Sequence, residues 1–146
     1  MRELTNFMID NFFESNPFYG GCFSSHSIKR NINPNEKKFY IVNLDYNRNA
    51  GTHWTLVSFI DPTTGIYFDS FAVPPPQTLY QFMKKHRKEN IMNSNVIQKL
   101  SSENCGYYCC YVGKMLSEYH RKFVDIMNDF SVDEKWNERF ITSVFN

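Results

Sequence analysis

Apolar and polar positions follow two different periods along the chain, and this predicts an α+β fold. Residues 2–14 carry apolar side chains at helical spacing, which predicts a helix. Three later runs of β-forming residues predict strands: "FYIVNLD" (39–45), "HWTLVSFI" (53–60) and "IYFDSF" (66–71). The turn sequences "NRNAG" and "DPTTG" separate the three runs, so adjacent strands of one sheet are expected.

The rest of the pattern predicts mostly helices around that sheet. Residues 16–25, with a proline and paired glycines, are predicted to form a loop. The remaining predicted elements are a helix over 77–90, a short strand over 96–100, a helix over 105–121 and a helix over 131–145. Ser131 and Glu134 have the spacing of a capping box at the start of the last helix. A mixed sheet flanked by helices is therefore expected.

Composition limits the class of protein. The chain has 146 residues, of which 42% are hydrophobic and 17% aromatic, so a single folded domain over 1–146 is expected. The formal net charge of +1 argues against a protein built to neutralise many phosphates. No apolar run approaches the ~18 residues that a membrane span needs, and residues 1–15 suggest an amphipathic helix rather than a signal peptide.

Three of the four cysteines, Cys105, Cys109 and Cys110, crowd into six positions, and Cys22 stands alone. An orderly disulfide framework is not expected from this spacing, so we predict free thiols in a reducing compartment. A metal site would need further ligands at suitable spacing, and none is visible in the sequence. Cys109 and Cys110 are expected to pack in the core.

Cys105 is the candidate with distinct chemistry, although a buried inert thiol is the alternative. The cap-forming sequence "SSEN" precedes it and a helical pattern follows, which places it at a helix N-terminus. The partial positive charge of that end favours a thiolate by roughly 0.3–2 kcal/mol. That is too little to make a strong nucleophile, so a nearby histidine is needed.

Of the four histidines, His53 is best placed to be this partner, because it begins a predicted strand. His86 lies in the basic sequence "KKHRK", His26 lies in a loop, and His120 is about four helical turns from Cys105. A catalytic histidine needs a third group to orient it. Asp69 ends the next predicted strand, and the hairpin between them would bring it beside His53.

Gln98 completes the candidate set. It precedes Cys105 by seven residues on the short predicted strand 96–100, which would point toward the start of the helix. Its side-chain amide could donate a hydrogen bond to a developing oxyanion, together with the Cys105 backbone N–H. For Asp69 and Gln98 the structural alternatives are a strand-end carboxylate and a surface amide.

This order of residues resembles the adenain family, which comprises the adenovirus maturation protease and relatives in DNA viruses, virophages and maverick-type elements. The similar segments are "GTHWTLVSFIDPTTGIYFDSF" and "IQKLSSENCGYYCC", and the resemblance extends over roughly residues 17–116. It is distantly shared with proteases of ubiquitin-like modifiers. The family pattern is a Gly-x-His-Trp stretch, an acidic residue after the next strand, and a Gln seven residues before Cys-Gly.

The resemblance implies a role for each matching position. Cys105 would be the nucleophile, His53 the general base and acid, Asp69 the group that orients His53, and Gln98 part of the oxyanion hole. Adenain itself has a glutamate at the position of Asp69. The residues expected at the substrate are Trp54, Gly51, Gly106, Cys22 and Asn104. For Trp54 and Cys22, core packing is the alternative.

The resemblance also implies a cysteine endopeptidase that processes viral structural precursors at Gly-Gly-X or Gly-X-Gly type sites. It would act as a monomer in the infected host cell and be packaged in the virion. Adenain is strongly basic and is stimulated by DNA and a disulfide-linked viral peptide. This chain is near neutral and has no cysteine in "KKHRKENIMNSNV", so no cofactor is expected and nucleic-acid contact is expected to be weak or absent. The alternatives are a protease for ubiquitin-like modifiers and an inert binding module of the same fold.

Overall fold

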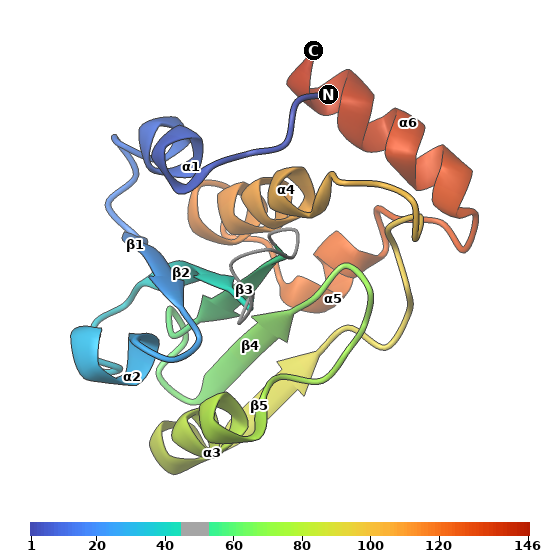
Figure 1. Cartoon of the computed structure of the whole chain (residues 1–146). Coiled ribbons are helices and arrows are strands. Elements are labelled where there is room, and N and C mark those ends of the chain that lie inside the picture. Colours follow the sequence, from blue (N-terminus) through green and yellow to red (C-terminus); the bar gives the residue numbers. More distant parts are fainter. Residues whose placement is uncertain (45–52) are drawn as a thin grey trace.

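A computed structural model describes residues 1–44 and 53–146 as a five-stranded sheet with helices on both faces (Figure 1). The order in the sheet is β1-β2-β3-β4-β5. The two outer pairs, β1 with β2 and β4 with β5, are parallel, whereas β3 is antiparallel to both of its neighbours. The strands are β1 (Tyr19–Ser24), β2 (Phe39–Asn43), β3 (Trp54–Ser58), β4 (Thr64–Phe68) and β5 (Glu89–Met92). This confirms the expected α+β class and the mixed sheet.

The alternation of side chains along the strands divides the core into two layers. On β2, Phe39 and Ile41 face one layer and Tyr40 and Val42 face the other. The first layer is covered mainly by α4 (Cys105–Ser117), with α1 (Asn6–Phe12), α5 (Phe123–Met127) and α6 (Glu134–Phe145) around it (Figure 1). The second is covered by α2 (Ile28–Asn31) and α3 (Gln77–His86).

The sequence prediction was wrong at both edges of the sheet. Residues 19–24, expected as part of a loop, form β1, whose side chains are all half-buried and so lack the alternation that marks a strand. Residues 96–100 form no strand, because the Ile97 and Gln98 N–H groups both donate to the Ser70 carbonyl. The last strand is β5, whose first residues were expected to belong to the helix over 77–90.

The helices are shorter than predicted. α3 ends at His86 because Arg87 is extended, with φ −133° and ψ 139°. α4 begins at Cys105 as expected, but it ends at Ser117 rather than at 121. At the start of α6 the cap is Asp133, whose carboxylate accepts from two backbone N–H groups, so the expected capping box from Ser131 is wrong. The short helices α2 and α5 were not predicted.

The antiparallel pair β3–β4 brings the candidate residues together at one end of these two strands. Leu56 pairs with Phe68 and Ser58 pairs with Ile66. Extending this register places residue 53, before β3, opposite residue 71, after β4. The start of β3 lies beside the end of β4. The residues just before β3 and just after β4 therefore meet there, next to the start of α4 (Figure 1).

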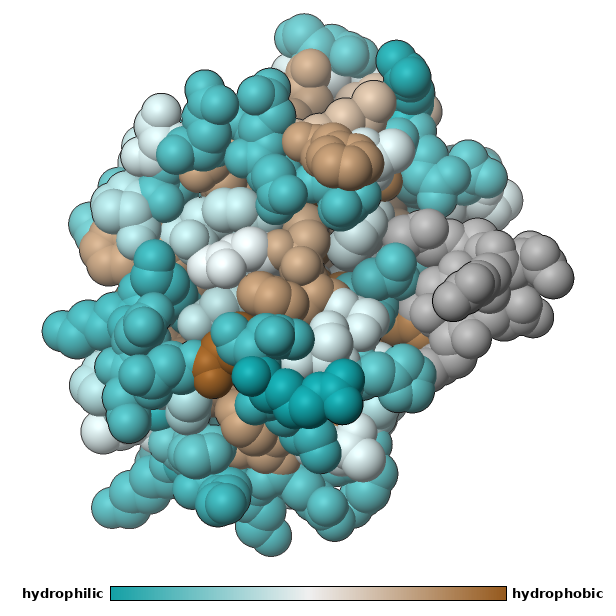
Figure 2. Space-filling model, turned by 60° about the vertical axis from the view of Figure 1, so that its left-hand side comes forward, coloured by the Kyte–Doolittle hydropathy of each residue, from teal (hydrophilic) through white to brown (hydrophobic). Residues whose placement is uncertain are grey.

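Hydrophilic side chains cover most of the face shown in Figure 2, with apolar side chains in small separate areas. Among the described residues, no helix combines the length and the apolar character that crossing a membrane requires.

Candidate active site

Cys105 is the first residue of α4, and this helix packs its buried face on the sheet. Asn104 forms the cap, and its backbone carbonyl accepts from the N–H groups of Tyr107 and Tyr108. The Tyr107 and Tyr108 N–H groups are thus used at the cap, and the N-terminus of α4 carries the partial positive charge of the helix beside Cys105. Cys105 is therefore held where a thiolate and an oxyanion are both stabilised.

His53 joins Cys105 to Asp69. Its Nε2 lies 3.0 Å from Asp69 Oδ1, and its ring is also hydrogen-bonded to Cys105. With Nε2 facing the carboxylate, Nδ1 is the nitrogen left for the thiol. Burial lowers the pKa of His53, but the hydrogen bonds to Asp69 and Cys105 outweigh it and raise the pKa to about 9. The imidazole is therefore protonated at neutral pH.

The Trp54 backbone lies between two thiols. Its N–H lies 3.4 Å from Cys105 Sγ, and its carbonyl accepts from Cys109 Sγ at 3.3 Å. Cys105 Sγ therefore accepts a hydrogen bond from the backbone of β3. The Trp54 indole is buried, and its Nε1 donates to the Leu4 carbonyl at 3.0 Å. Trp54 thus packs in the core as well as beside Cys105.

Asp69 is fixed from several sides. Its backbone N–H donates to Asn93 Oδ1 at 3.2 Å, and its carbonyl accepts from Asn93 Nδ2 at 2.7 Å. Its Oδ1 also accepts from the Phe71 N–H at 2.8 Å. The carboxylate is almost completely buried, and its Oδ2 has no partner among the residues that the structure describes. A buried carboxylate held this firmly can fix the orientation of the His53 ring.

Gln98 lies in the loop between β5 and α4, not on a strand. It is buried, its Oε1 accepts from Ser70 Oγ at 2.5 Å, and its Nε2 donates to the Ser102 carbonyl at 2.8 Å. Among residues 1–44 and 53–146 this is the acceptor of Nε2, so its second hydrogen could serve a substrate oxygen. The interpretation of Gln98 as a surface amide is therefore wrong.

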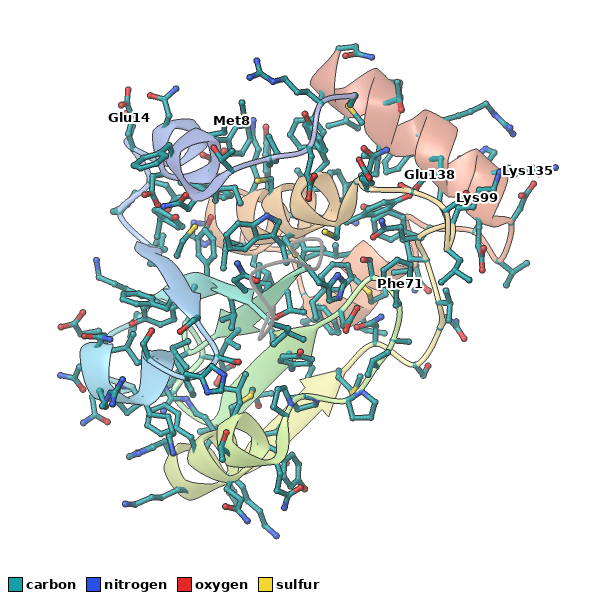
Figure 3. The ribbon with its side chains drawn as sticks, in the orientation of Figure 1. Met8, Glu14, Phe71, Lys99, Lys135 and Glu138 are labelled. Carbon is teal, nitrogen blue, oxygen red and sulfur yellow. The ribbon has the colours of Figure 1, made fainter. Side chains whose placement is uncertain are left out.

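The expected substrate-binding residues have different surroundings. Asn104 Nδ2 donates to Glu138 Oε1 at 3.2 Å. Glu138 is labelled on α6 in Figure 3. Cys22 lies on β1 with its Sγ 3.2 Å from the Tyr19 hydroxyl, packed against the core, and burial raises its pKa to about 12. It therefore fits the core alternative. Gly51 lies outside the described residues.

Gly106 is in close contact with the N-terminal segment. A Cβ at this position would lie 3.1 Å from the Leu4 Cβ and 3.2 Å from Trp54 Cδ1. The Arg2 carbonyl accepts from the Tyr107 hydroxyl in the same region. The absence of a side chain at Gly106 thus allows residues 2–4 and Trp54 to pack closely. The sequence does not reveal this reason for a glycine at this position.

Three residues that support the site were not predicted from the sequence: Ser70, Phe71 and Asn93. Phe71, labelled in Figure 3 in the loop after β4, stacks on the His53 ring with centroids 5.2 Å apart and planes at 29°. Ser70 and Asn93 hold Gln98 and Asp69 respectively. The only signal for two of them is that they directly follow Asp69 in "DSF".

The thiols are not paired with one another. Among the described residues, no cysteine forms a disulfide. Burial raises the pKa of Cys109 far above its ordinary range and that of Cys110 as well, which makes both poor nucleophiles. Within residues 1–44 and 53–146, no group of three or more His, Cys, Asp or Glu side chains could hold a metal ion.

Comparison with known proteins gives matches in structure only: no family model and no curated protein matches the sequence. Two crystal structures of the ASFV pS273R protease superpose with TM-scores of 0.62 and 0.61 at 18% and 16% sequence identity. Both cover 92% of this chain, but this chain spans only 64% and 65% of theirs, less than two thirds. ChlaDub1 from Chlamydia trachomatis superposes with a TM-score of 0.52 at 20% identity, over 94% of this chain and 72% of its own.

The fold is therefore similar to that of the ASFV pS273R protease and of ChlaDub1. At these identities the likeness concerns the fold alone. The narrower resemblance to adenain and the assigned roles of the site residues stay predictions.

Proposed function

We propose that this chain is a cysteine endopeptidase whose catalytic residues are Cys105, His53, Asp69 and Gln98. One observation carries the proposal: a continuous chain of hydrogen bonds runs from the buried Asp69 carboxylate through the His53 ring to Cys105 at the start of α4. A structural histidine has no need of a buried carboxylate on one side and a helix-terminal thiol on the other. The fold shared with known cysteine proteases supports the same activity.

In the proposed reaction the Cys105 thiolate attacks the carbonyl carbon of the scissile peptide. The protonated His53 gives its proton to the leaving amine, and a thioester between Cys105 and the acyl part remains. Water then attacks the thioester, His53 accepts a proton from this water, and the Cys105 thiolate is regenerated as the acid product leaves. Asp69 stabilises the imidazolium and keeps its orientation through both steps.

The oxyanion of each tetrahedral intermediate would be held by two donors. They are the second Nε2 hydrogen of Gln98 and the backbone N–H of Cys105 at the start of α4. Loss of one such donor costs about 10²–10³-fold in kcat in comparable sites. We therefore expect Gln98→Ala to retain slow cleavage and Cys105→Ala to have none.

The substrates we propose are viral structural precursors cut after small residues, at Gly-Gly-X or Gly-X-Gly type sequences. This part comes from the resemblance of "GTHW" and "NCGYYCC" to the adenain family. With it come the proposed place of action, which is the infected host cell and the virion, a monomeric state, and activity without a cofactor. A protease for ubiquitin-like modifiers is the alternative, since this fold also serves that class.

The test is cleavage of a fluorogenic peptide ending in Gly-Gly by the wild type, Cys105→Ala and His53→Ala, without added DNA or peptide. Cys110→Ala is the matched control, because it removes a thiol from the same helix at a core position. We expect turnover by the wild type and the control only. Stoichiometric labelling with a thiol reagent should be lost in Cys105→Ala.

An inert binding module would leave the peptide uncut at every enzyme concentration and show slow labelling of Cys105, and this result would overturn the proposal. Turnover that survives in Cys105→Ala would do the same. A folded modifier carrying a C-terminal Gly-Gly reporter separates the two substrate classes. If it is cut far faster than the short peptide, the enzyme acts on modifiers rather than on viral precursors.

A further inference from the structure

Ser70 is a fully buried serine in the turn after β4, and it contacts Gln98 with both its backbone and its side chain. Its carbonyl accepts from the Ile97 N–H at 2.9 Å and the Gln98 N–H at 3.1 Å. Its hydroxyl donates to Gln98 Oε1 at 2.5 Å. A serine in the interior with this many contacts to one residue is built to hold that residue in place.

The partners of the Gln98 amide settle which way it faces. The Ser102 carbonyl can only accept, so the atom that faces it must be Nε2. The oxygen then faces Ser70, whose hydroxyl must be the donor. With both ends of the amide fixed, the direction of the second Nε2 hydrogen is fixed as well.

We propose that Ser70 is a positioning residue, whose hydroxyl holds the Gln98 amide so that its free Nε2 hydrogen meets the oxyanion. The inference rests on the proposed protease function. Without the Ser70 hydroxyl, Gln98 Oε1 would be buried without a donor, and the amide could rotate about its last side-chain bond to seek one. The oxyanion donor would then spend part of its time in the wrong direction.

Ser70 also connects the two groups proposed to act beside Cys105, which are His53 and Gln98. Its neighbour Asp69 is hydrogen-bonded to His53. The Asn93 side chain makes two hydrogen bonds with the Asp69 backbone. The adjacent residues Asp69 and Ser70 therefore position His53 and Gln98 from the same turn. A displacement of this turn would disturb both, whereas loss of the Ser70 hydroxyl should disturb only Gln98.

The test is a double-mutant cycle in the full chain with Ser70→Ala, Gln98→Ala and the double variant. We expect Ser70→Ala to lower kcat about 10-fold, part of the loss of a whole oxyanion donor, with KM unchanged. In the Gln98→Ala background, Ser70→Ala should cause no further loss. The matched control is Ser117→Ala, a buried serine in the last turn of α4 whose hydroxyl bonds to Asn16 and the Gly113 carbonyl; its kcat should stay at the wild-type value.

A second measurement separates positioning from general damage. The rate of Cys105 alkylation by iodoacetamide involves no oxyanion, so it should be equal in the wild type and Ser70→Ala. The proposal is overturned if this rate falls together with kcat, if the two losses multiply in the double variant, or if Ser70→Ala keeps full activity. Should Ser70→Ala fail to fold, Ser70→Cys fills the same site with a weaker donor and should give an intermediate kcat; full activity of that variant would contradict the proposal.

A wrong protease function can be distinguished from a wrong role for Ser70. If the wild type cuts neither the peptide nor the folded modifier reporter, the proposed function is wrong whatever Ser70 does. The side-chain NH₂ signals of Gln98 in an NMR spectrum, assigned by their loss in Gln98→Ala, then still test the orientation. They should shift in Ser70→Ala and not in Ser117→Ala, and unchanged signals would overturn the inference.

Discussion

At the scale of single residues, the charge of His53 depends on a balance between burial and two hydrogen bonds. Burial alone would make it neutral, and the bonds to Asp69 and Cys105 reverse this, raising its pKa to about 9. The site is therefore built to keep an imidazolium beside the sulfur at neutral pH. Such a pair supplies both a nucleophile and the proton that the leaving amine needs.

Asp69→Asn should lower the pKa of His53 toward or below its ordinary value. The variant keeps the shape of the side chain but removes its negative charge, so burial is no longer opposed by the carboxylate. An NMR titration of the His53 ring should give a midpoint near 9 in the wild type and at least about 1 pH unit lower in Asp69→Asn. Asp129→Asn is the control, because Asp129 pairs with Arg121 and not with His53.

The same shift makes stability depend on pH. The folded pKa of His53 lies above the ordinary value of 6.5, so the folded state binds the proton more tightly than the unfolded chain. The contribution is fully present below about pH 6.5 and is lost as pH rises through 9. The free energy of unfolding should fall over this window by on the order of 1–3 kcal/mol, and the fall should shrink in Asp69→Asn. An equal fall in both proteins would show that His53 is not its cause.

The four candidate catalytic residues could be found from the sequence because each carries its chemistry in its type, and their order and spacing are informative. Their supports could not. Ser70 and Asn93 are ordinary polar residues whose roles arise from contacts with Gln98 and Asp69, each 24 to 28 positions away in sequence. The close packing of Leu4 against Gly106 likewise depends on the tertiary fold.

At the scale of elements, α4 lies unusually close to the sheet at Gly113. A Cβ there would lie 2.7 Å from Phe39 Cε2 and 3.3 Å from Phe13 Cζ, and both rings are buried. Gly113→Ala should therefore destabilise the protein by about 1–3 kcal/mol through overpacking. The better helix propensity of alanine, worth about 1 kcal/mol, offsets only part of this.

Urea unfolding would measure this change. Lys114→Ala is the control on the exposed side of the same helix, and it should stay within about 0.5 kcal/mol of the wild type. A stabilised Gly113→Ala would mean that the helix can move away from Phe39, which would contradict the close packing. Because α4 carries Cys105, such freedom would also weaken the case for a preorganised nucleophile.

The elements that the sequence predicted well are those with a clear period and local end signals. The three central strands are marked by β-formers between turns, and α4 by the cap sequence before Cys105. Both edge strands were missed for physical reasons. In β1 two glycines and uniform half-burial remove the alternation, and β5 follows directly on the charged end of α3, so the pattern contains no break.

At the scale of the whole molecule, the positive and negative charges of the chain nearly balance. Basic and acidic residues number 16 and 15. In the one basic cluster, "KKHRK", Arg87 is buried and its guanidinium donates to four backbone carbonyls, those of Pro34, Phe59, Asp61 and His86. Partial burial and the charges of Lys85 and Arg87 lower the pKa of His86, so it adds little charge at neutral pH.

Double-stranded DNA should therefore leave peptide cleavage unchanged. We expect kcat/KM to vary less than about two-fold on adding DNA at 50 mM salt, because only Lys84, Lys85 and Lys88 of the cluster remain exposed. A protein that makes six or more phosphate contacts would instead bind DNA tightly at this salt and lose about 10³-fold or more in affinity by 200 mM. If DNA stimulates cleavage and the double variant Lys84→Glu/Lys85→Glu abolishes the stimulation, the charged face of α3 is a nucleic-acid site. The likeness to adenain would then extend to its activation, and the near-neutral charge of the chain would have misled the prediction.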